Sequence, residues 1–262
     1  MTTVNNILSV LAETAPLSMQ ESYDNAGLLI GDPDMEVDRA LITLDATEDV
    51  VDEAIAKSCT LIVSHHPLIF RPLKSLVPTT PTQKTAIKMV RNGIALISMH
   101  TNLDNSFYGV NHILAQVLGL HDIRILQPMN DNPMIGAGMI GTLENEMTEA
   151  DFLAHICEKL QTPCLRHNKM RGKGVKTVAI CGGSGAFLVP QAVCEGADAY
   201  VTADIKYHEF ADADNIFLVD AGHFETEQFA KQLLKEIIIK KIPNFAAQIS
   251  EKSQNPVSYF VK

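Results

Sequence analysis

Hydrophobic residues along this chain follow two patterns that alternate. Short, mainly apolar runs occur at residues 40–44, 61–64, 94–98, 175–181, 199–202 and 216–219. Runs of this length, bounded by polar residues, are typical of strands buried on both faces of a parallel sheet. Segments with apolar residues three and four positions apart occur at residues 3–12, 48–57, 82–92, 110–117 and 148–160. They predict amphipathic helices, and the alternation predicts an α/β protein.

The strand and helix pattern occurs twice. A strand–helix–strand–helix–strand order covers residues 40–98 and again residues 175–219, and in each copy the second and third strands end in histidine and acidic residues. The repetition predicts two similar three-layer α/β lobes that face each other. A polar, proline-bounded stretch at residues 127–133 predicts the point where the chain crosses between the lobes.

Composition narrows the class of protein. The chain has 262 residues, of which 46% are hydrophobic, and its apolar runs are far shorter than the about 20 residues of a membrane span. Its N-terminus lacks a basic patch followed by an apolar stretch, so we expect a cytoplasmic protein without a membrane segment. The five cysteines form no Cys-x-x-Cys pair, and we expect reduced thiols.

The charge balance bears on possible partners. The net charge is −10, which argues against a general binder of nucleic acid. One local exception is a basic loop at residues 166–176. Its cations are Arg166, Lys169, Arg171, Lys173 and Lys176. Contact with a nucleotide or a nucleic acid is one interpretation of this loop, and a solvent-facing loop is the other, which we favour.

Histidine and acidic side chains gather where predicted strands end. The clusters are His65-His66, His100 with Asp104, Asp204 with His208 and Glu209, and His223 with Glu227. Open α/β sheets bind ligands at the carboxyl ends of their strands. Adjacent side chains on an extended segment point opposite ways, so His65 and His66 are expected to serve two neighbouring metals. If a helix begins at His223, Glu227 lies one turn further on the same face.

This donor set favours transition metals. Imidazole with carboxylate suits zinc, iron, manganese or cobalt more than calcium or magnesium. Two histidines and two carboxylates from separate strand ends, one of them bridging, suit two metals ~3.5–4 Å apart. Such a pair acidifies a bound water and stabilises a developing oxyanion. Asp204 and His208 are candidates for acid–base or substrate contacts from the second lobe.

Several of these features also have structural interpretations. Asp104 could cap a turn, and the His223–Glu227 pair could be an exposed helix pair. His100 could be an outer partner of the site or simply a strand end. The segment with Asp204 and His208 could be a solvated loop. The Gly-Gly-Ser-Gly sequence at residues 182–185 could cradle a phosphate or form a plain turn.

Six short motifs together resemble the NIF-three-like family, also known as GTP cyclohydrolase I type 2 homologs. They are Asp-Asn-Ala-Gly-Leu-Leu-Ile-Gly at residues 24–31, Ser-His-His-Pro at 64–67, His-Thr-Asn-Leu-Asp at 100–104, Gly-Gly-Ser-Gly at 182–185, Asp-Ile-Lys-Tyr-His-Glu at 204–209 and Gly-His-Phe-Glu-Thr-Glu at 222–227. They occur in the family's order and span most of the chain.

The resemblance implies a specific site and architecture. It implies two metals held by His65, His66, Asp104, His223 and Glu227, with Glu227 as the bridge. Glu225 is a neighbouring acid, but the four-residue spacing and the motif both favour Glu227. The second lobe is implied to be inserted into the first, giving a first lobe of residues 1–127 and 216–262 and a second of residues 128–215, with the di-metal site between them. The family's assembly implies a homohexamer.

Two functions follow as hypotheses. The first is a di-metal-dependent hydrolase in which activated water attacks a nucleotide-like or heterocyclic substrate, with Glu227, His208 and Asp204 as the catalytic candidates. GTP as the substrate rests on the resemblance alone. The second is a metal-binding regulatory or interaction protein without turnover. A third interpretation, a nucleic-acid-binding ring based on residues 166–176, is disfavoured by the acidic balance.

Overall fold

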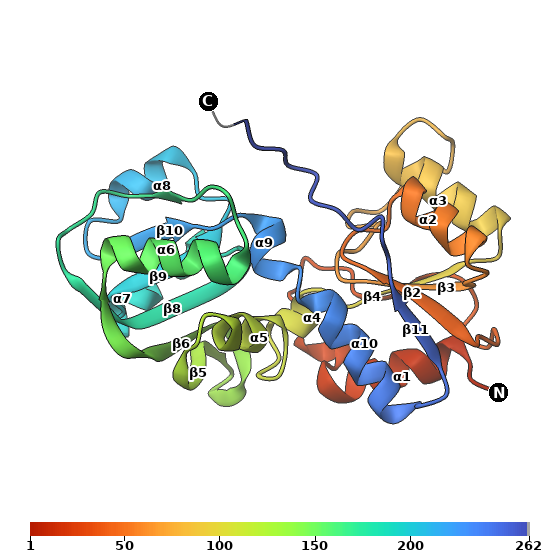
Figure 1. The fold of residues 1–262 in the computed structure, drawn as a ribbon. Helices are drawn as coiled ribbons and strands as arrows, with labels where there is room; N and C mark the ends of the chain where they lie inside the picture. Colours follow the sequence, from red (N-terminus) through yellow and green to blue (C-terminus); the bar gives the residue numbers. More distant parts are fainter. Residues whose placement is uncertain (261–262) are drawn as a thin grey trace. The chain divides into compact units, whose positions relative to one another are not determined.

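The computed structural model describes residues 1–260, which fold into two compact units. The first unit combines Met1–Leu103 with Ala230–Gln254, and the second combines Asp104–Phe229 with the residues from Asn255 onward. Each unit contains one sheet with helices packed on it (Figure 1). The chain is therefore an α/β protein with two sheets, as the alternating pattern predicts.

The first unit is built on a five-stranded sheet in the order β1-β4-β3-β2-β11. The strands are β1 (Gly27–Ile30), β2 (Arg39–Thr43), β3 (Leu61–Ser64), β4 (Ala95–Ser98) and β11 (Ala246–Ile249). All neighbouring pairs are parallel except β1 with β4. Every residue of β3 and β4 is buried, which is why these strands are apolar rather than alternating. Their last residues, Ser64 and Ser98, are the exceptions, and their hydroxyls hydrogen-bond to each other at 2.8 Å.

Helices cover both faces of this sheet. Helices α2 (Glu48–Ala56) and α3 (Pro81–Arg91) lie on one face, and α1 (Val4–Thr14) and α10 (Ala230–Lys241) lie on the other (Figure 1). Thr47 and Thr80 begin α2 and α3 by accepting hydrogen bonds from backbone N–H groups of the first turn. These caps fix where the two helices begin.

The second unit contains a six-stranded sheet in the order β5-β6-β8-β9-β10-β7. The strands are β5 (His121–Met129), β6 (Asn132–Thr148), β7 (Arg166–His167), β8 (Gly174–Ser184), β9 (Ala199–Ala203) and β10 (Phe217–Asp220). Strands β8, β9 and β10 are parallel, as are β2, β3 and β4 in the first unit. The predicted repeat of strand–helix–strand–helix–strand is present.

Two hydrophobic layers sandwich the second sheet. On one face, α5 (Val110–Val117) and α6 (Glu149–Leu160) pack against the sheet through residues such as Leu114 and Phe152. On the other face lie the short helix η2 (Ala186–Leu188), α7 (Val189–Cys194) and α8 (Tyr207–Asp212). Successive β9 residues face opposite layers: Tyr200 joins the second layer and Val201 the first. The remaining helical turns are η1 (Leu17–Met19), α4 (Thr101–Asp104) and α9 (His223–Glu227).

The structure differs from the expected crossing at residues 127–133. These residues form the tip of the hairpin that joins β5 to β6, whose strands pair antiparallel. The turn residues Asn130 and Asp131 both have positive φ, 52° and 57°, as a two-residue hairpin turn requires. Because β5 and β10 pair with strands of the second sheet, residues 104–127 and 216–229 belong to the second unit and not to the first.

A buried carboxylate fastens the end of β11 to α2. Glu53 accepts hydrogen bonds from Ser250 Oγ at 2.5 Å, from the backbone N–H groups of Glu251 and Lys252 at 3.0 and 3.2 Å, and from Lys57 Nζ at 2.7 Å. Burial by itself would raise the pKa of Glu53, but these hydrogen bonds outweigh it and lower the pKa from 4.5 to about 2.

Glu53→Gln is expected to reduce the free energy of unfolding by about 2 kcal/mol at pH 7, because a charged acceptor with several donors is lost. Since the folded-state pKa is depressed, this stabilisation is present above pH 4.5 and is lost as the pH falls towards about 2. Urea unfolding at pH 7 and pH 3 measures both effects. Glu13→Gln, at an exposed ion pair with Lys241, is the control. Equal acid sensitivity in wild type and Glu53→Gln would contradict the assignment.

Among residues 1–260, no helix combines the length and the apolar character that crossing a membrane requires.

Candidate metal centre

Both adjacent histidines lie just past the carboxyl end of β3. The His65 N–H donates to Thr43 O at 3.2 Å and the His66 N–H donates to Leu44 O at 2.9 Å. Ser64 Oγ, at the end of β3, donates to His66 O at 2.7 Å. The backbone that carries the two imidazoles is therefore held against the neighbouring strand β2, as expected for a ligand site at a strand end.

His65 is oriented by the end of the next strand. Its side chain is completely buried, and its Nδ1 lies 2.7 Å from the carbonyl oxygen of Met99, which follows β4. A carbonyl oxygen only accepts hydrogen bonds, so Nδ1 carries the proton and Nε2 keeps its lone pair. This is the tautomer with which a histidine binds a metal through Nε2.

His66 and His100 are oriented in the same way by carboxylates. His66 Nδ1 lies 2.8 Å from Asp45 Oδ1, and His100 Nδ1 lies 2.8 Å from Asp24 Oδ1. Asp24 also accepts from the N–H and the hydroxyl of Thr101. Burial would raise the pKa of Asp24, but the hydrogen bonds from His100 and Thr101 outweigh it and lower the pKa to about 2. Asp24 is therefore an anion that accepts from His100 at neutral pH.

The three imidazoles form one group in the first unit. Ring centroids are 5.0 Å apart for His65 and His66, 5.4 Å for His65 and His100, and 5.6 Å for His66 and His100. The expected divergence of adjacent side chains does not separate His65 from His66, because the regular strand ends at Ser64. His100, which the sequence leaves between two interpretations, belongs to this group. Nothing in its local sequence reveals that, because its partner Asp24 is 76 positions away.

In the second unit, α9 presents the predicted histidine and carboxylate together. His223 Nε2 lies 2.9 Å from Glu227 Oε2, four residues along the helix. His223 Nδ1 lies 2.7 Å from Asp204 Oδ2, so Asp204 orients this imidazole as Asp45 orients that of His66. Glu227 is buried, whereas His223 is partly exposed. The shared helix face of His223 and Glu227, expected from their spacing, is present.

The glycine-rich segment at residues 182–185 supports these residues. Gly183 has a φ of +59°, and a Cβ atom there would lie 2.2 Å from Glu227 Oε1. Its backbone N–H groups donate to side-chain oxygens: Gly182 to Asn111, Gly183 to Thr226 and Gly185 to Thr202. Since these donors are engaged, the segment functions as a close-packed support for α9, and the phosphate-cradle interpretation loses its basis.

Asp104 ends the short helix α4. The buried thiol of Cys181 lies within the electrostatic influence of both Asp104 and Glu227: burial, together with their negative charges, raises the pKa of Cys181 far above its usual range. Two of the predicted acidic ligands, Asp104 and Glu227, therefore both act electrostatically on the Cys181 thiol in the second unit. Cys181 is therefore expected to be a neutral thiol there.

The other predicted residues have different surroundings. His208 is exposed on α8 with its ring beside that of Tyr207, the centroids being 5.3 Å apart. In the basic loop, Arg166 pairs with Asp220 and Arg171 pairs with Glu149, while Lys176 Nζ donates to a backbone carbonyl. Three of the loop's five cations thus stabilise the second unit, which further weakens the nucleic-acid interpretation.

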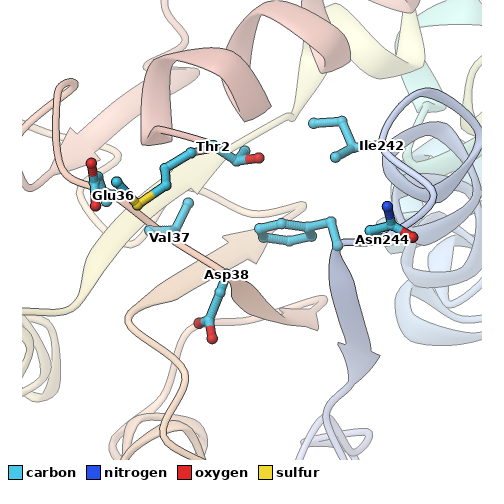
Figure 2. Close-up of a pocket in the computed structure, with 8 residues that line it drawn as sticks. Thr2, Glu36, Val37, Asp38, Ile242 and Asn244 are labelled. Atoms are coloured by element: carbon cyan, nitrogen blue, oxygen red, sulfur yellow. The ribbon is translucent and has the colours of Figure 1, made fainter.

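One pocket borders the histidine group. It has a volume of about 440 Å³ within the first unit, and its lining includes His66, Asp45 and the start of α2. A second pocket of this unit, of about 410 Å³, is lined by the N-terminal residues and the segment before β11 (Figure 2). Its lining contains none of the candidate ligands, whereas the lining of the pocket beside the histidine group includes His66.

Comparisons with known proteins all point to one protein family. The family model Duf34/NIF3 (NGG1p interacting factor 3) matches residues 2–256. A Campylobacter jejuni protein named GTP cyclohydrolase 1 type 2 homolog is 34% identical, covering 98% of this chain and 99% of its own length. A Clostridium acetobutylicum protein with the same name is 35% identical over 86% of this chain and 85% of its own.

Solved structures agree with this match. A hypothetical protein of Staphylococcus aureus superposes with a TM-score of 0.92 at 34% identity, covering 98% of this chain and 99% of its own. A Bacillus cereus protein related to NIF3 superposes with a TM-score of 0.91 at 26% identity and 99% coverage of both chains. Similarity therefore extends over both units.

Proposed function

The chain belongs to the Duf34/NIF3 family, and from this premise and the geometry of each unit we propose that it is a di-metal-dependent hydrolase. The proposed ligands are His65 and His66 from the first unit and Asp104, His223 and Glu227 from the second. Glu227 is the proposed bridge. The ions are two divalent transition metals, drawn from zinc, iron, manganese and cobalt.

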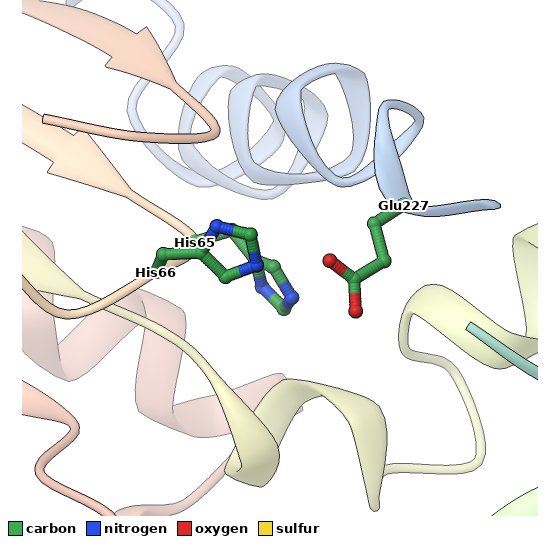
Figure 3. A group of neighbouring side chains, drawn as sticks. All are labelled: His65, His66 and Glu227. Atoms are coloured by element: carbon green, nitrogen blue, oxygen red, sulfur yellow. The ribbon is translucent and has the colours of Figure 1, made fainter. Parts of the chain in front are cut away.

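The orientation of the histidines is the observation that carries the proposal. His65, His66 and His223 each place Nδ1 against an oxygen acceptor. Nε2 is then the atom that would bind a metal, and Nε2 of His223 faces another proposed ligand, Glu227, at 2.9 Å. Figure 3 shows His65 and His66 on the loop after β3 and Glu227 on α9. Together these side chains offer imidazole nitrogen and carboxylate oxygen, a donor set that could hold a metal.

The side chains around the proposed metal pair have different proposed roles. When bound, the metal pair supplies an acidified water and stabilises the developing oxyanion. Asp45 and Asp204 orient His66 and His223 through the hydrogen bonds to their Nδ1 atoms. Glu227, Asp204 and His208 are our proposed catalytic residues: Glu227 would act as the bridging ligand, Asp204 through the imidazole of His223, and His208, exposed on α8, as the acid–base group.

The proposed substrate is a nucleotide-like or heterocyclic compound. The name of the relatives points to GTP as the first compound to test. We further propose a cytoplasmic homohexamer. The alternative is a metal-binding interaction protein without turnover, which one observation favours: the loop after the histidine pair exposes apolar side chains, with Leu76 53% and Val77 48% exposed.

Turnover separates the two functions. Metal-free protein should be loaded with zinc, manganese, iron or cobalt and incubated with a panel of nucleoside triphosphates, nucleosides and free heterocycles. We expect hydrolysis of at least one compound, its loss on adding a chelator, and its recovery on adding metal. Metal binding without any metal-dependent product would contradict the hydrolase and support the interaction protein.

A further inference from the structure

Glu225 lies on α9 between two proposed ligands, but it faces another way. Residues two positions apart on a helix point to nearly opposite sides, whereas residues four apart share a face. His223 and Glu227 are therefore on one side of α9 and Glu225 is on the other. The Glu225 residue is only 5% exposed, so its carboxylate needs polar partners.

Those partners come from the end of the chain. Asn255 Nδ2 donates to Glu225 Oε1 at 2.9 Å, and the hydroxyl of Tyr259 donates to the same oxygen at 3.1 Å. Asn255 Oδ1 accepts from the backbone N–H of Val257 at 2.9 Å, which fixes the orientation of its amide. We call residues 255–259 the C-terminal anchor; they belong to the same compact unit as α9.

The contact is suited to holding a buried anion. Burial and the neighbouring Glu225 carboxylate raise the pKa of Tyr259 to about 12, so its hydroxyl stays protonated and donates at neutral pH. Removing a donor from a buried carboxylate costs more free energy than an average hydrogen bond contributes. The hydrogen bonds from the anchor therefore stabilise the present rotamer of Glu225.

The backbone at the start of α9 is fitted to the same contact. Gly222 precedes α9 with a φ of +90°, and a Cβ atom there would lie 2.2 Å from Glu225 Oε2 and 3.3 Å from the hydroxyl of Tyr259. The backbone thus packs directly on the carboxylate and its donor. Holding Glu225 on one side of α9 adds to the contact of Thr226 with Gly183 in setting the rotation of the helix, and with it the side that His223 and Glu227 occupy.

We propose that Asn255 and Tyr259 are positioning residues for the metal centre, holding Glu225 away from it. This inference rests on the proposed metal function. If the anchor is lost, Glu225 loses both of these side-chain donors and α9 loses one of the contacts that set its orientation, so Glu225 becomes available as an alternative ligand. Groups that orient metal ligands from outside typically contribute about 10–100-fold to metal affinity.

The test is cobalt(II) binding to the full chain, followed by chelator competition and by the visible absorption of the bound ion, which reports coordination geometry. The variants are Tyr259→Phe and the double variant Tyr259→Phe with Asn255→Ala. Tyr207→Phe, at a residue 81% exposed, is the matched control. We expect at least about 10-fold weaker binding and an altered spectrum for the double variant, a smaller change for Tyr259→Phe, and none for Tyr207→Phe.

A third substitution separates competition by Glu225 from general loosening of α9. Adding Glu225→Gln to the double variant removes the competing carboxylate and is expected to return the spectrum to that of wild type. Wild-type affinity and an unchanged spectrum in the folded double variant would overturn the positioning role. Absence of cobalt binding in the wild type would instead refute the proposed metal function itself, and the inference with it.

Discussion

His66→Ala is expected to weaken metal binding by more than the about 100-fold that loss of an outer partner of a ligand produces, because it removes a proposed ligand itself. The substitution should change stability little. His66 is partly exposed, and its side-chain partner Asp45 is itself 44% exposed, so water can replace the lost contact. Competition with a chromophoric chelator measures the affinity, and urea unfolding of the metal-free protein measures the stability.

His65→Ala provides the comparison within the same pair. It is expected to lose metal binding equally, but also to lose about 2–4 kcal/mol of stability without metal, because the His65 side chain is completely buried and satisfies Met99 O. His167→Ala, at an exposed histidine of β7, controls for non-specific loss of imidazole. Metal affinity within twofold of wild type in His66→Ala would remove this residue from the site.

Asp104→Asn is expected to reduce metal-dependent hydrolysis by at least about 100-fold, because it weakens a proposed ligand of the metal pair, and loss of even an outer partner of a ligand typically costs about 10–100-fold. The substitution preserves shape and removes a single negative charge. Steady-state rates on whichever compound the substrate panel identifies, at saturating metal, measure the effect. Asp131→Asn is a suitable control, because this residue lies in the β5–β6 turn with a φ that asparagine tolerates.

The effect of Asp104→Asn also distinguishes a role of Asp104 in metal ligation from another role in catalysis. Retained hydrolysis that still depends on metal would show that Asp104 is not part of the catalytic site. Loss of hydrolysis with unchanged metal content would indicate a role in catalysis rather than in ligation. Loss of both is what a ligand of the metal pair predicts.

The parallel strands could be predicted because their burial determines their sequence. The apolar run at residues 61–64 matches β3 residue for residue, and every position in it is buried. Since a strand covered on both faces has no polar side, its end is marked by the first polar residues, here Ser64 and the histidines that follow it. The histidines that follow were therefore placed correctly at a strand end.

The hairpin and the edge strand could not be predicted in the same way. Strand β5 mixes exposed and buried positions, and β11 is a four-residue edge strand whose partner β2 lies some 200 positions earlier. Neither has a pattern strong enough to identify it. The polar, proline-bounded stretch at residues 127–133 predicts a crossing between lobes, whereas it forms the tip of the β5–β6 hairpin.

Contacts between segments far apart in the sequence could not be predicted either. His100 joins the histidine group through Asp24, and Glu225 is held by Asn255 and Tyr259. Each of these pairs depends on where the fold brings together two segments that are unrelated in sequence. Residue type and spacing predict candidate ligands, but not the partners that orient them.

Metal content per chain is the most direct test of the central claim. Elemental mass spectrometry should be applied to protein purified without chelators and without a histidine tag, beside the His66→Ala variant. The account predicts close to two transition-metal ions per chain in the wild type and half of that or less in the variant. Absence of metal from the wild type, even after incubation with zinc, manganese and iron, would contradict it.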